Sequence, residues 1–557
     1  MSCRHRLACA AVALLIGTPA WAAESQSQEQ SLQELRNTVI NLLQTLVDKG
    51  LLTREQAELL VKQAQERAAA EAASNAAAAK EEQNAVRVPY VPQIVKDEIS
   101  KQVAEQVKPE VVQSVVTEAK SEKWGVPAAL PEWLSHVRPF GDVTFRGQAD
   151  MYPKDNANAA ANPGICASYV LCPILDFNGI NAAGGIAKDP FPYLNITENR
   201  DRFRLRARLG LDAELSPNFT SQVRLSSGSL TDPSSESQTQ GTYGERYSVA
   251  IDRAYSRWNS SPAGQLSIIT LEGGRYENPW FAPTELVWAR DLQFEGVAGA
   301  LRVGLDGGSA NSSHLFLNFA AVPELEVPTE ISEDKWLLGA QLGTDLHWAD
   351  GTQHAQLAGA LYDFLHVTGV RNSPFSTLTN VTAPAFIRFG NTVFDISNQP
   401  SDTTVNLFAL AAHFRVVDLS GSYELAFPRY SLAVTAEAVR NFGYHIADIE
   451  ALTGQAITSA QNHGYVADVS FGDPVVQRRW AWRARVGYRY VQSDAVIDAW
   501  TDADFHEGGT NAAGFYLWGD LGLAQNVWVR VRYFSANEIT GPRYGNDIVQ
   551  VDLNTRF

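Results

Sequence analysis

From Gly141 to the C-terminus, apolar and polar residues alternate with a period of two. The clearest run extends from Arg202 to Leu215, where an apolar residue follows almost every arginine. Such alternation indicates a strand with one apolar and one polar face. A strand in a soluble protein is typically about six residues long, whereas crossing a bilayer takes about 9 to 11 tilted residues. The pattern therefore predicts strands that are long enough to span a membrane.

Segments of this kind recur along the chain, and their connections tend to alternate between short and long. Sixteen segments are predicted: 142–152, 202–215, 219–228, 247–258, 265–276, 291–303, 313–321, 335–348, 353–366, 405–417, 430–441, 464–472, 478–491, 513–524, 527–536 and 547–557. Short periplasmic turns and long external loops are typical of bacterial outer-membrane barrels. The predicted fold class is therefore an all-β transmembrane barrel of about 16 antiparallel strands, over residues 136–557, with both ends in the periplasm.

Two details fit this pattern poorly. The connection 418–429 is longer than the alternation of short and long connections predicts. Arg253 falls in phase with Val249 and Ile251, which indicates a bulge or a misplaced strand boundary.

The first 135 residues have a different character. Residues 1–22 are predicted to be a signal peptide, with Arg4 and Arg6 before a short apolar run and an Ala-Trp-Ala cleavage site. Residues 23–135 are predicted to form a helical periplasmic segment, because apolar residues recur at helical spacing. Apolar residues at every fourth position from 91 to 115 suggest a coiled coil. That spacing drifts around a helix and Pro109 interrupts it, so a spacer helix on the peptidoglycan side is equally compatible.

Cysteine content and charge narrow the compartment and the partners. Cys3 and Cys9 leave with the signal peptide, and Cys166 and Cys172 lie in a predicted external loop, so we predict a disulfide between them. The net charge of −17 argues against nucleic acid as a partner. The expected surroundings are outer-membrane lipid, and possible contact with peptidoglycan is left open.

The sequence contains no strong catalytic motif. The chain has no G-x-S-x-G elbow, no H-E-x-x-H and no phosphate-binding loop, and its histidines are scattered. We therefore predict that the protein is not an enzyme and that it uses no cofactor and no metal.

The polar faces of the strands predict a pore lined by three arginine ladders. They comprise Arg202, Arg204, Arg206 and Arg208, then Arg479, Arg483, Arg485 and Arg489, and finally Arg530 and Arg532. Cationic side chains along a pore favour anions. Acidic residues such as Asp212, Asp520 and Asp552 share these faces, and pairing with them would make the arginines structural instead. Both interpretations stay open.

Two further features bear on assembly and pore width. The last strand ends in Phe557, which resembles the C-terminal signal read by the barrel-assembly machinery of outer membranes. The stretch 276–283 is aromatic and stiffened by proline, so it either packs against the inner wall or caps the barrel from outside.

An ordered series of motifs resembles the "putative porin" family of Gram-negative outer membranes. The series comprises residues 42–64, Arg224 to Gly228 followed by Asp232 to Ser235, Asp252 to Tyr255, Gly274 to Trp280, and Phe294 to Val297. The resemblance implies a general channel in the cell outer membrane that assembles as a homotrimer, and it carries no catalytic residues over. The expected function is passive diffusion of small hydrophilic solutes. A substrate-selective anion channel, a barrel enzyme and an envelope-tethering barrel whose helices contact peptidoglycan are the alternatives.

Overall fold

The computed structural model describes residues 136–157, 174–189, 192–260, 267–305, 312–327, 333–348, 351–398 and 406–557. The predicted signal peptide 1–22, the predicted helical segment 23–135, and Cys166 and Cys172 lie outside these residues. These predictions stay untested.

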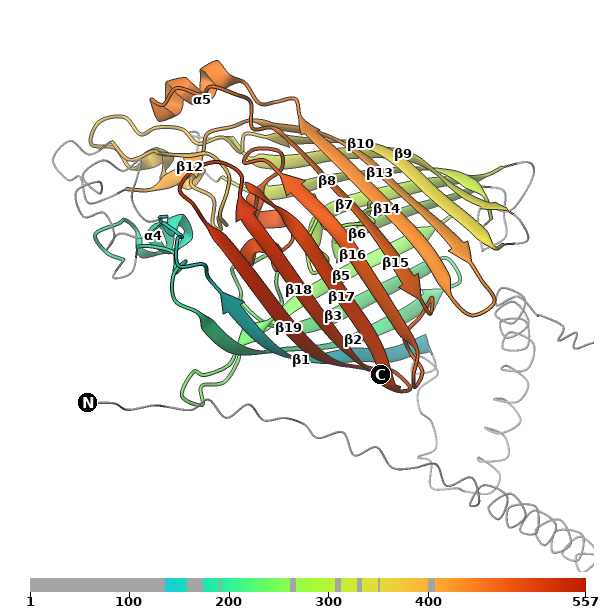
Figure 1. Cartoon of the computed structure of the whole chain (residues 1–557). Helices are drawn as coiled ribbons and strands as arrows, with labels where there is room; N and C mark the ends of the chain where they lie inside the picture. The colour runs from blue at the N-terminus through green and yellow to red at the C-terminus, as the bar shows by residue number, and fades with distance from the viewer. Residues whose placement is uncertain are drawn as a thin grey trace, which may run out of the picture. The chain divides into compact units, whose positions relative to one another are not determined.

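The described residues form a closed antiparallel barrel (Figure 1). Its sheet contains 17 strands, and β4 (Gln238–Thr239) is a two-residue strand within a loop, so 16 strands build the wall. The wall strands are β1 (Val137–Met151), β2 (Arg200–Ser216), β3 (Phe219–Ser227), β5 (Val249–Asn259), β6 (Ser267–Glu277), β7 (Gln293–Gly304), β8 (His314–Leu325), β9 (Lys335–Trp348), β10 (Gln353–Leu365), β13 (Phe414–Ala426), β14 (Ser431–Asn441), β15 (His463–Gly472), β16 (Trp482–Val491), β17 (Ala512–Ala524), β18 (Val527–Glu538) and β19 (Gly545–Arg556). The predicted strand number is confirmed.

The remaining elements lie in the connections. They are α4 (Phe177–Ala183), α5 (Ile446–Thr453), the short strands β11 (Val393–Asp395) and β12 (Phe408–Leu410), and three 3₁₀ turns at Leu378–Thr382, Asp498–Trp500 and Phe505–Glu507. Among the described residues, no helix is long and apolar enough to cross a membrane.

The barrel closes between its first and last strands. Asp142 of β1 lies opposite Arg556 of β19, so the chain enters β1 and leaves β19 at the same end of the barrel. Gly141 and Phe557 exchange two backbone hydrogen bonds, of 3.0 and 3.1 Å, and the Phe557 ring lies over Gly141. We call this end, where the short turns also lie, the short-turn end.

Along much of the wall, apolar side chains face outward and polar side chains face inward, while aromatic residues such as Tyr362 and Phe364 of β10 are buried on the inner side. On β2, Leu209, Leu211 and Leu215 are exposed on the outer surface. Their neighbours Arg206 and Arg208 are largely buried inside, at 21% and 14% side-chain exposure. An apolar outer surface is what a bilayer requires of a barrel, because lipid replaces water there.

Some inward positions need glycine because an aromatic ring occupies the space of a side chain. A Cβ at Gly210 would lie 2.3 Å from the Phe140 ring on the paired strand. At Gly519, on the outer face of β17, a Cβ would by contrast meet nothing within 4 Å.

One predicted strand is wrong. The segment 405–417 was expected to cross the membrane, but the wall strand is β13 at 414–426. Residues 408–410 instead form β12, which pairs with β11 in the loop, and Ala409 and Leu410 are buried in the core. The residues just before Phe414 are apolar because they pack in the hydrophobic core, where Ala411 and Ala412 are buried as well. With the correct strand, the connection to β14 is the short turn 427–430, and the alternation of connections holds.

The pairing also places two other strand boundaries. Arg224 lies opposite Arg253, while the next residue, Leu225, lies opposite Ile251, so Asp252 is the extra residue of a bulge. Of the two alternatives, a bulge or a misplaced boundary, the pairing shows the bulge, and Arg253 faces inward. The strand predicted at 478–491 begins only at Trp482.

Candidate pore constriction

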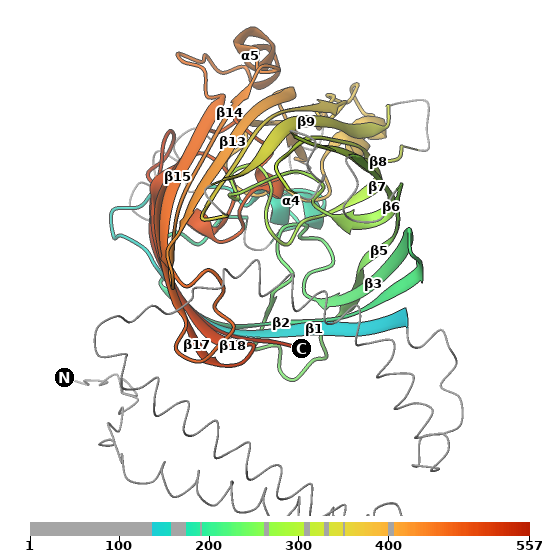
Figure 2. The same ribbon diagram turned by 90° about the vertical axis from the view of Figure 1, so that its right-hand side faces the viewer.

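The loop 278–292, between β6 and β7, folds into the barrel. The Trp280 ring packs edge-on against Tyr362 of β10, with centroids 5.3 Å apart. The backbone N–H of Phe281 donates to Oε1 of Gln341 on β9 at 2.7 Å, and the Thr284 hydroxyl donates to Glu437 on β14. The aromatic stretch therefore packs against the inner wall and does not cap the barrel from outside. In Figure 2, the strands of the wall surround loop segments that fold into the barrel.

The same loop then reaches the arginines of β2. Asp291 lies 2.9 Å from Arg206 and 3.6 Å from Arg208. Arg290 pairs with Glu285 of its own loop at 3.1 Å. The loop is thus held to β9, β10 and β14 by its first half and to β2 by its last residues.

A second inward segment is the loop 492–511, between β16 and β17. Asp504 lies 2.7 Å from Arg146 on β1 and 2.8 Å from Arg532 on β18. Its Oδ1 also accepts a hydrogen bond of 2.9 Å from Gln550 on β19. Asp502 pairs with Arg489 on β16 at 3.3 Å. Removing one partner from a buried ion pair costs about 3–5 kcal/mol, so these contacts fix the loop.

Between the two loops and the wall lies a narrow cavity of about 100 Å³. Its charged lining consists of five guanidinium groups, Arg146, Arg206, Arg290, Arg530 and Arg532, and five carboxylates, Glu285, Asp291, Asp502, Asp504 and Asp552. The wall supplies most of the cations and the two loops most of the anions. We call this place the constriction.

Facing arginines keep two loop carboxylates of the constriction, Asp504 and Asp291, ionised. Burial by itself raises the pKa of Asp504, but Arg146 and Arg532 outweigh it and hold that pKa far below its usual range. At Asp291 burial likewise raises the pKa, but Arg206 and Arg208 outweigh it, and the pKa of Asp291 is lowered. At Glu285 burial prevails over Arg290 and the pKa is raised.

The first predicted arginine ladder lies on the inner face of β2 and is mostly paired. Arg202 lies 2.5 Å from Asp150, and Arg208 lies 2.8 Å from Asp142. Among the described residues Arg204 has no carboxylate within ion-pair distance. Its guanidinium donates to the Ser235 hydroxyl at 3.2 Å and to the Ser237 carbonyl at 3.1 Å.

The other two ladders are only partly as predicted. Arg485 and Arg489 lie inside β16 and pair with acids, and Arg530 lies 2.6 Å from Asp520. Arg483 donates to backbone carbonyls near the short-turn end. Arg479 was assigned to a strand, but it lies in the turn before β16, with its guanidinium over the Trp480 ring.

Sequence reasoning missed the surroundings of two inward aromatic residues on β17, Trp518 and Tyr516. Trp518 on β17 is surrounded by three guanidinium groups, those of Arg485, Arg530 and Arg290, whose carbons lie 4.6, 5.2 and 5.9 Å from ring centroids of Trp518. The alternation on β17 predicts an inward Trp518 but not its neighbours, because Arg290 comes from a loop. Tyr516 on the same strand also faces inward, and its hydroxyl donates to Asp468 at 2.8 Å.

Comparison with known proteins agrees with this architecture. A family model described as "Putative porin" matches residues 36–557. The chain belongs to this porin family. A porin is a channel of the outer membrane, and family and fold therefore indicate a channel rather than an enzyme. Among curated proteins, none matches the sequence of this porin.

Solved structures similar to this porin include the outer membrane channel DcaP, OprB and OmpF. DcaP of Acinetobacter baumannii is 10% identical, with a TM-score of 0.37, over 76% of this chain and 97% of that chain. OprB of Pseudomonas putida is 9% identical, with a TM-score of 0.41, over 76% and 96%. OmpF of Salmonella typhi is 10% identical, with a TM-score of 0.37, over 76% and 97%.

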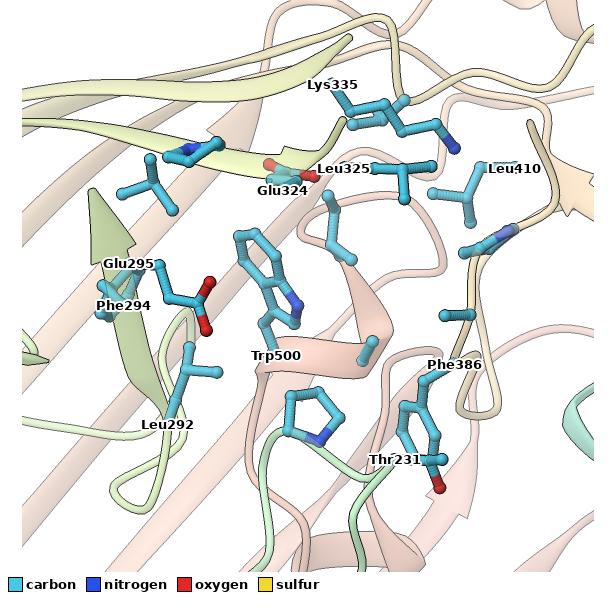
Figure 3. Close-up of a pocket in the computed structure, with 18 of the residues that line it drawn as sticks. Thr231, Leu292, Phe294, Glu295, Glu324, Leu325, Lys335, Phe386, Leu410 and Trp500 are labelled. Atoms are coloured by element: carbon cyan, nitrogen blue, oxygen red, sulfur yellow. The ribbon is translucent and has the colours of Figure 1, made fainter. Parts of the chain in front are cut away.

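The porin has a second, larger cavity of about 500 Å³ toward the long-loop end. Pairing of β7 with β8 stops at Val297 and Ala321, so residues 293–296 and 322–325 of these strands do not pair with each other. The cavity lies at this split in the wall. Figure 3 shows the Trp500 indole inside it, near Glu295 of β7 and Glu324 of β8. Its lining is mostly apolar, which suits the apolar part of a solute better than an ion.

Proposed function

We propose that this porin is a passive diffusion channel for small hydrophilic solutes. The observation that supports the proposal is the constriction, where loops 278–292 and 492–511 fold inside the barrel and meet a polar, charged wall. Polar side chains replace the water that a hydrophilic solute loses on entering a narrow pore, and a charged lining selects by sign.

The two loops set the charge balance. With five guanidinium groups against five carboxylates, the lining of the constriction is formally neutral. An anion preference from the arginine ladders is therefore expected to be small. Its source is Arg204, which lacks an acidic partner among the described residues, rather than the paired arginines.

Planar-bilayer recording tests the channel. Purified, folded protein should give stepwise ion currents, and liposomes that contain it should swell in isotonic solutions of small neutral solutes. Absence of stepwise current from folded protein would overturn the channel proposal and leave the alternative, an envelope-tethering barrel whose helical segment contacts peptidoglycan.

The reversal potential in a salt gradient tests the anion preference. Arg204→Gln should reduce the preference, whereas Arg429→Gln, which removes the same charge from an exposed turn, should not. Equal reversal potentials for the two variants would exclude the role of Arg204.

We also propose that the porin assembles as a homotrimer. The outer surface over β9 to β15 has an apolar hollow whose floor includes the small residues Gly359, Gly421, Ala436, Ala438 and Ala467. Small residues let a second chain approach closely, so packing contacts in the membrane accumulate.

Light scattering in mild detergent tests the assembly. The wild type should have the mass of a trimer, and Ala438→Trp should dissociate it. Val551→Trp, on the exposed outer face of β19, is the matched control. A monomeric wild type would refute the trimer. A trimeric Ala438→Trp variant would show that the subunit interface does not include this hollow.

A further inference from the structure

Two histidines and an aspartate meet at the short-turn end of the pore. His347 is near the end of β9 and His354 near the start of β10, and the two residues lie directly opposite each other in the sheet. Their rings stack with centroids 4.2 Å apart and planes only 4° from parallel. The Nε2 atoms of His347 and His354 lie 2.8 and 2.9 Å from the same oxygen, Oδ1 of Asp345.

This arrangement presents three potential metal ligands together. One ligand atom from each residue lies within 4.8 Å of the others. Around a tetrahedral zinc ion, with bonds of about 2.0–2.1 Å, neighbouring ligand atoms stand about 3.3 Å apart. The two Nε2–Oδ1 separations therefore have to widen by only about 0.5 Å to admit a metal ion.

Neighbouring residues support ligation by Asp345. The side-chain amide of Gln356, on β10, donates to the other carboxylate oxygen, Oδ2, at 2.6 Å. That bond orients the carboxylate and leaves Oδ1 facing the two imidazoles, as an outer-shell partner of a metal ligand does. His314 on β8 lies opposite Asp345 in the sheet and adds a further imidazole beside the cluster.

The cluster is accessible from the lumen. Asp345, Gln356 and His314 line a polar cavity of about 630 Å³ inside the barrel. The side chains of His347 and His354 are 38% and 30% exposed. An ion can therefore enter without unfolding the wall.

We propose that Asp345, His347 and His354 bind one divalent transition-metal ion, Zn²⁺, Ni²⁺ or Cu²⁺, at the short-turn mouth of the pore. Imidazole suits these ions, whereas Mg²⁺ and Ca²⁺ prefer oxygen ligands. Three protein ligands leave coordination positions open to water. The sequence predicted no metal site, because the histidines belong to two strands and only the register of the hairpin brings them together.

A structural alternative explains the same contacts without a metal: both imidazoles donate to Asp345 and hold the β9–β10 hairpin closed. The two explanations differ in metal binding. The experiment uses the full-length protein without a histidine tag, folded in detergent, and measures binding by calorimetry and by equilibrium dialysis with metal analysis. Zn²⁺, Ni²⁺ and Cu²⁺ are compared with Mg²⁺ and Ca²⁺.

The wild type should bind one equivalent of Zn²⁺ per chain and should not bind Mg²⁺ at the same concentration. Gln356→Leu should weaken Zn²⁺ binding by roughly 10–100-fold, and His347→Gln or His354→Gln should weaken it further. His463→Gln, which removes a histidine from β15 where its ring stacks on Tyr490, should bind like the wild type. Circular dichroism and heat-dependent migration on gels confirm that each variant is folded.

Two results would overturn the proposed metal site. One is a wild type that binds no more Zn²⁺ than the folded His347→Gln/His354→Gln double variant. The other is wild-type affinity in either single variant. Because the readout is binding, this outcome is independent of whether the barrel conducts ions.

Discussion

Replacement of Asp504 by asparagine should make the pore anion-selective. In the folded protein this carboxylate pairs with Arg146 at 2.7 Å and with Arg532 at 2.8 Å. Asparagine keeps the size of the side chain and its hydrogen bond from Gln550, but it removes one negative charge. The lining of the constriction then changes from five cations and five anions to five and four.

The size of the effect follows from the size of the constriction. A cavity of about 100 Å³ places an ion at its centre roughly 5 Å from the lining charges. At that distance in water one uncompensated charge contributes about 0.8 kcal/mol. Screening at about 0.1 M salt reduces this to about 0.5 kcal/mol. The local concentration of anions in the constriction therefore rises about 2.3-fold, and that of cations falls by the same factor. The ratio of anion to cation permeability should shift about fivefold toward anions.

Reversal potentials in a salt gradient measure this shift. Asp155→Asn is the matched control, because Asp155 is exposed in a loop at the opposite end from the short turns and pairs with Arg543 away from the constriction. Asp291→Asn, on the other inward loop, should shift selectivity in the same direction as Asp504→Asn. The reasoning fails if Asp504→Asn has the reversal potential of Asp155→Asn, or if its shift favours cations.

Three further predictions concern the loops and the wall. Trp288→Ala removes a buried anchor of loop 278–292, worth about 3–5 kcal/mol, and should raise single-channel conductance, whereas Trp480→Ala, in an exposed turn, should not. Burial lowers the pKa of His506 from 6.5 to about 4, so its neutral ring stabilises the fold above pH 6.5 and this stabilisation is lost as the pH falls through 4. Thermal unfolding of the wild type should therefore lose about 3 kcal/mol more between those pH values than that of His506→Gln, and equal losses would contradict the burial argument. Gly210→Ala should cost about 1–3 kcal/mol in denaturant unfolding, because a ring occupies the position of its Cβ, while Gly519→Ala, in open space, should cost little.

Most of the wall could be predicted from the sequence alone. Twofold alternation is a local property, since each residue of a strand faces either lipid or lumen, and this is why the strand number could be predicted and the irregularity at Arg253 could be detected. The same rule failed before Phe414, where the consecutive residues Ala409 to Ala412 are all buried, so that alternation carries no information about the wall. It also misplaced Arg479, because polar turn residues can mimic the inward face of a strand.

Tertiary structure decided what the pore contains. The path of loop 278–292 depends on contacts with distant strands, such as Trp280 on Tyr362, and no local pattern encodes them. Whether the arginine ladders carry free charge depends on Asp291 and Asp504, which arrive from loops far along the chain. Alternation tells which side chains point inward, but the charge that a solute meets depends on which inward side chains neutralise one another across the lumen.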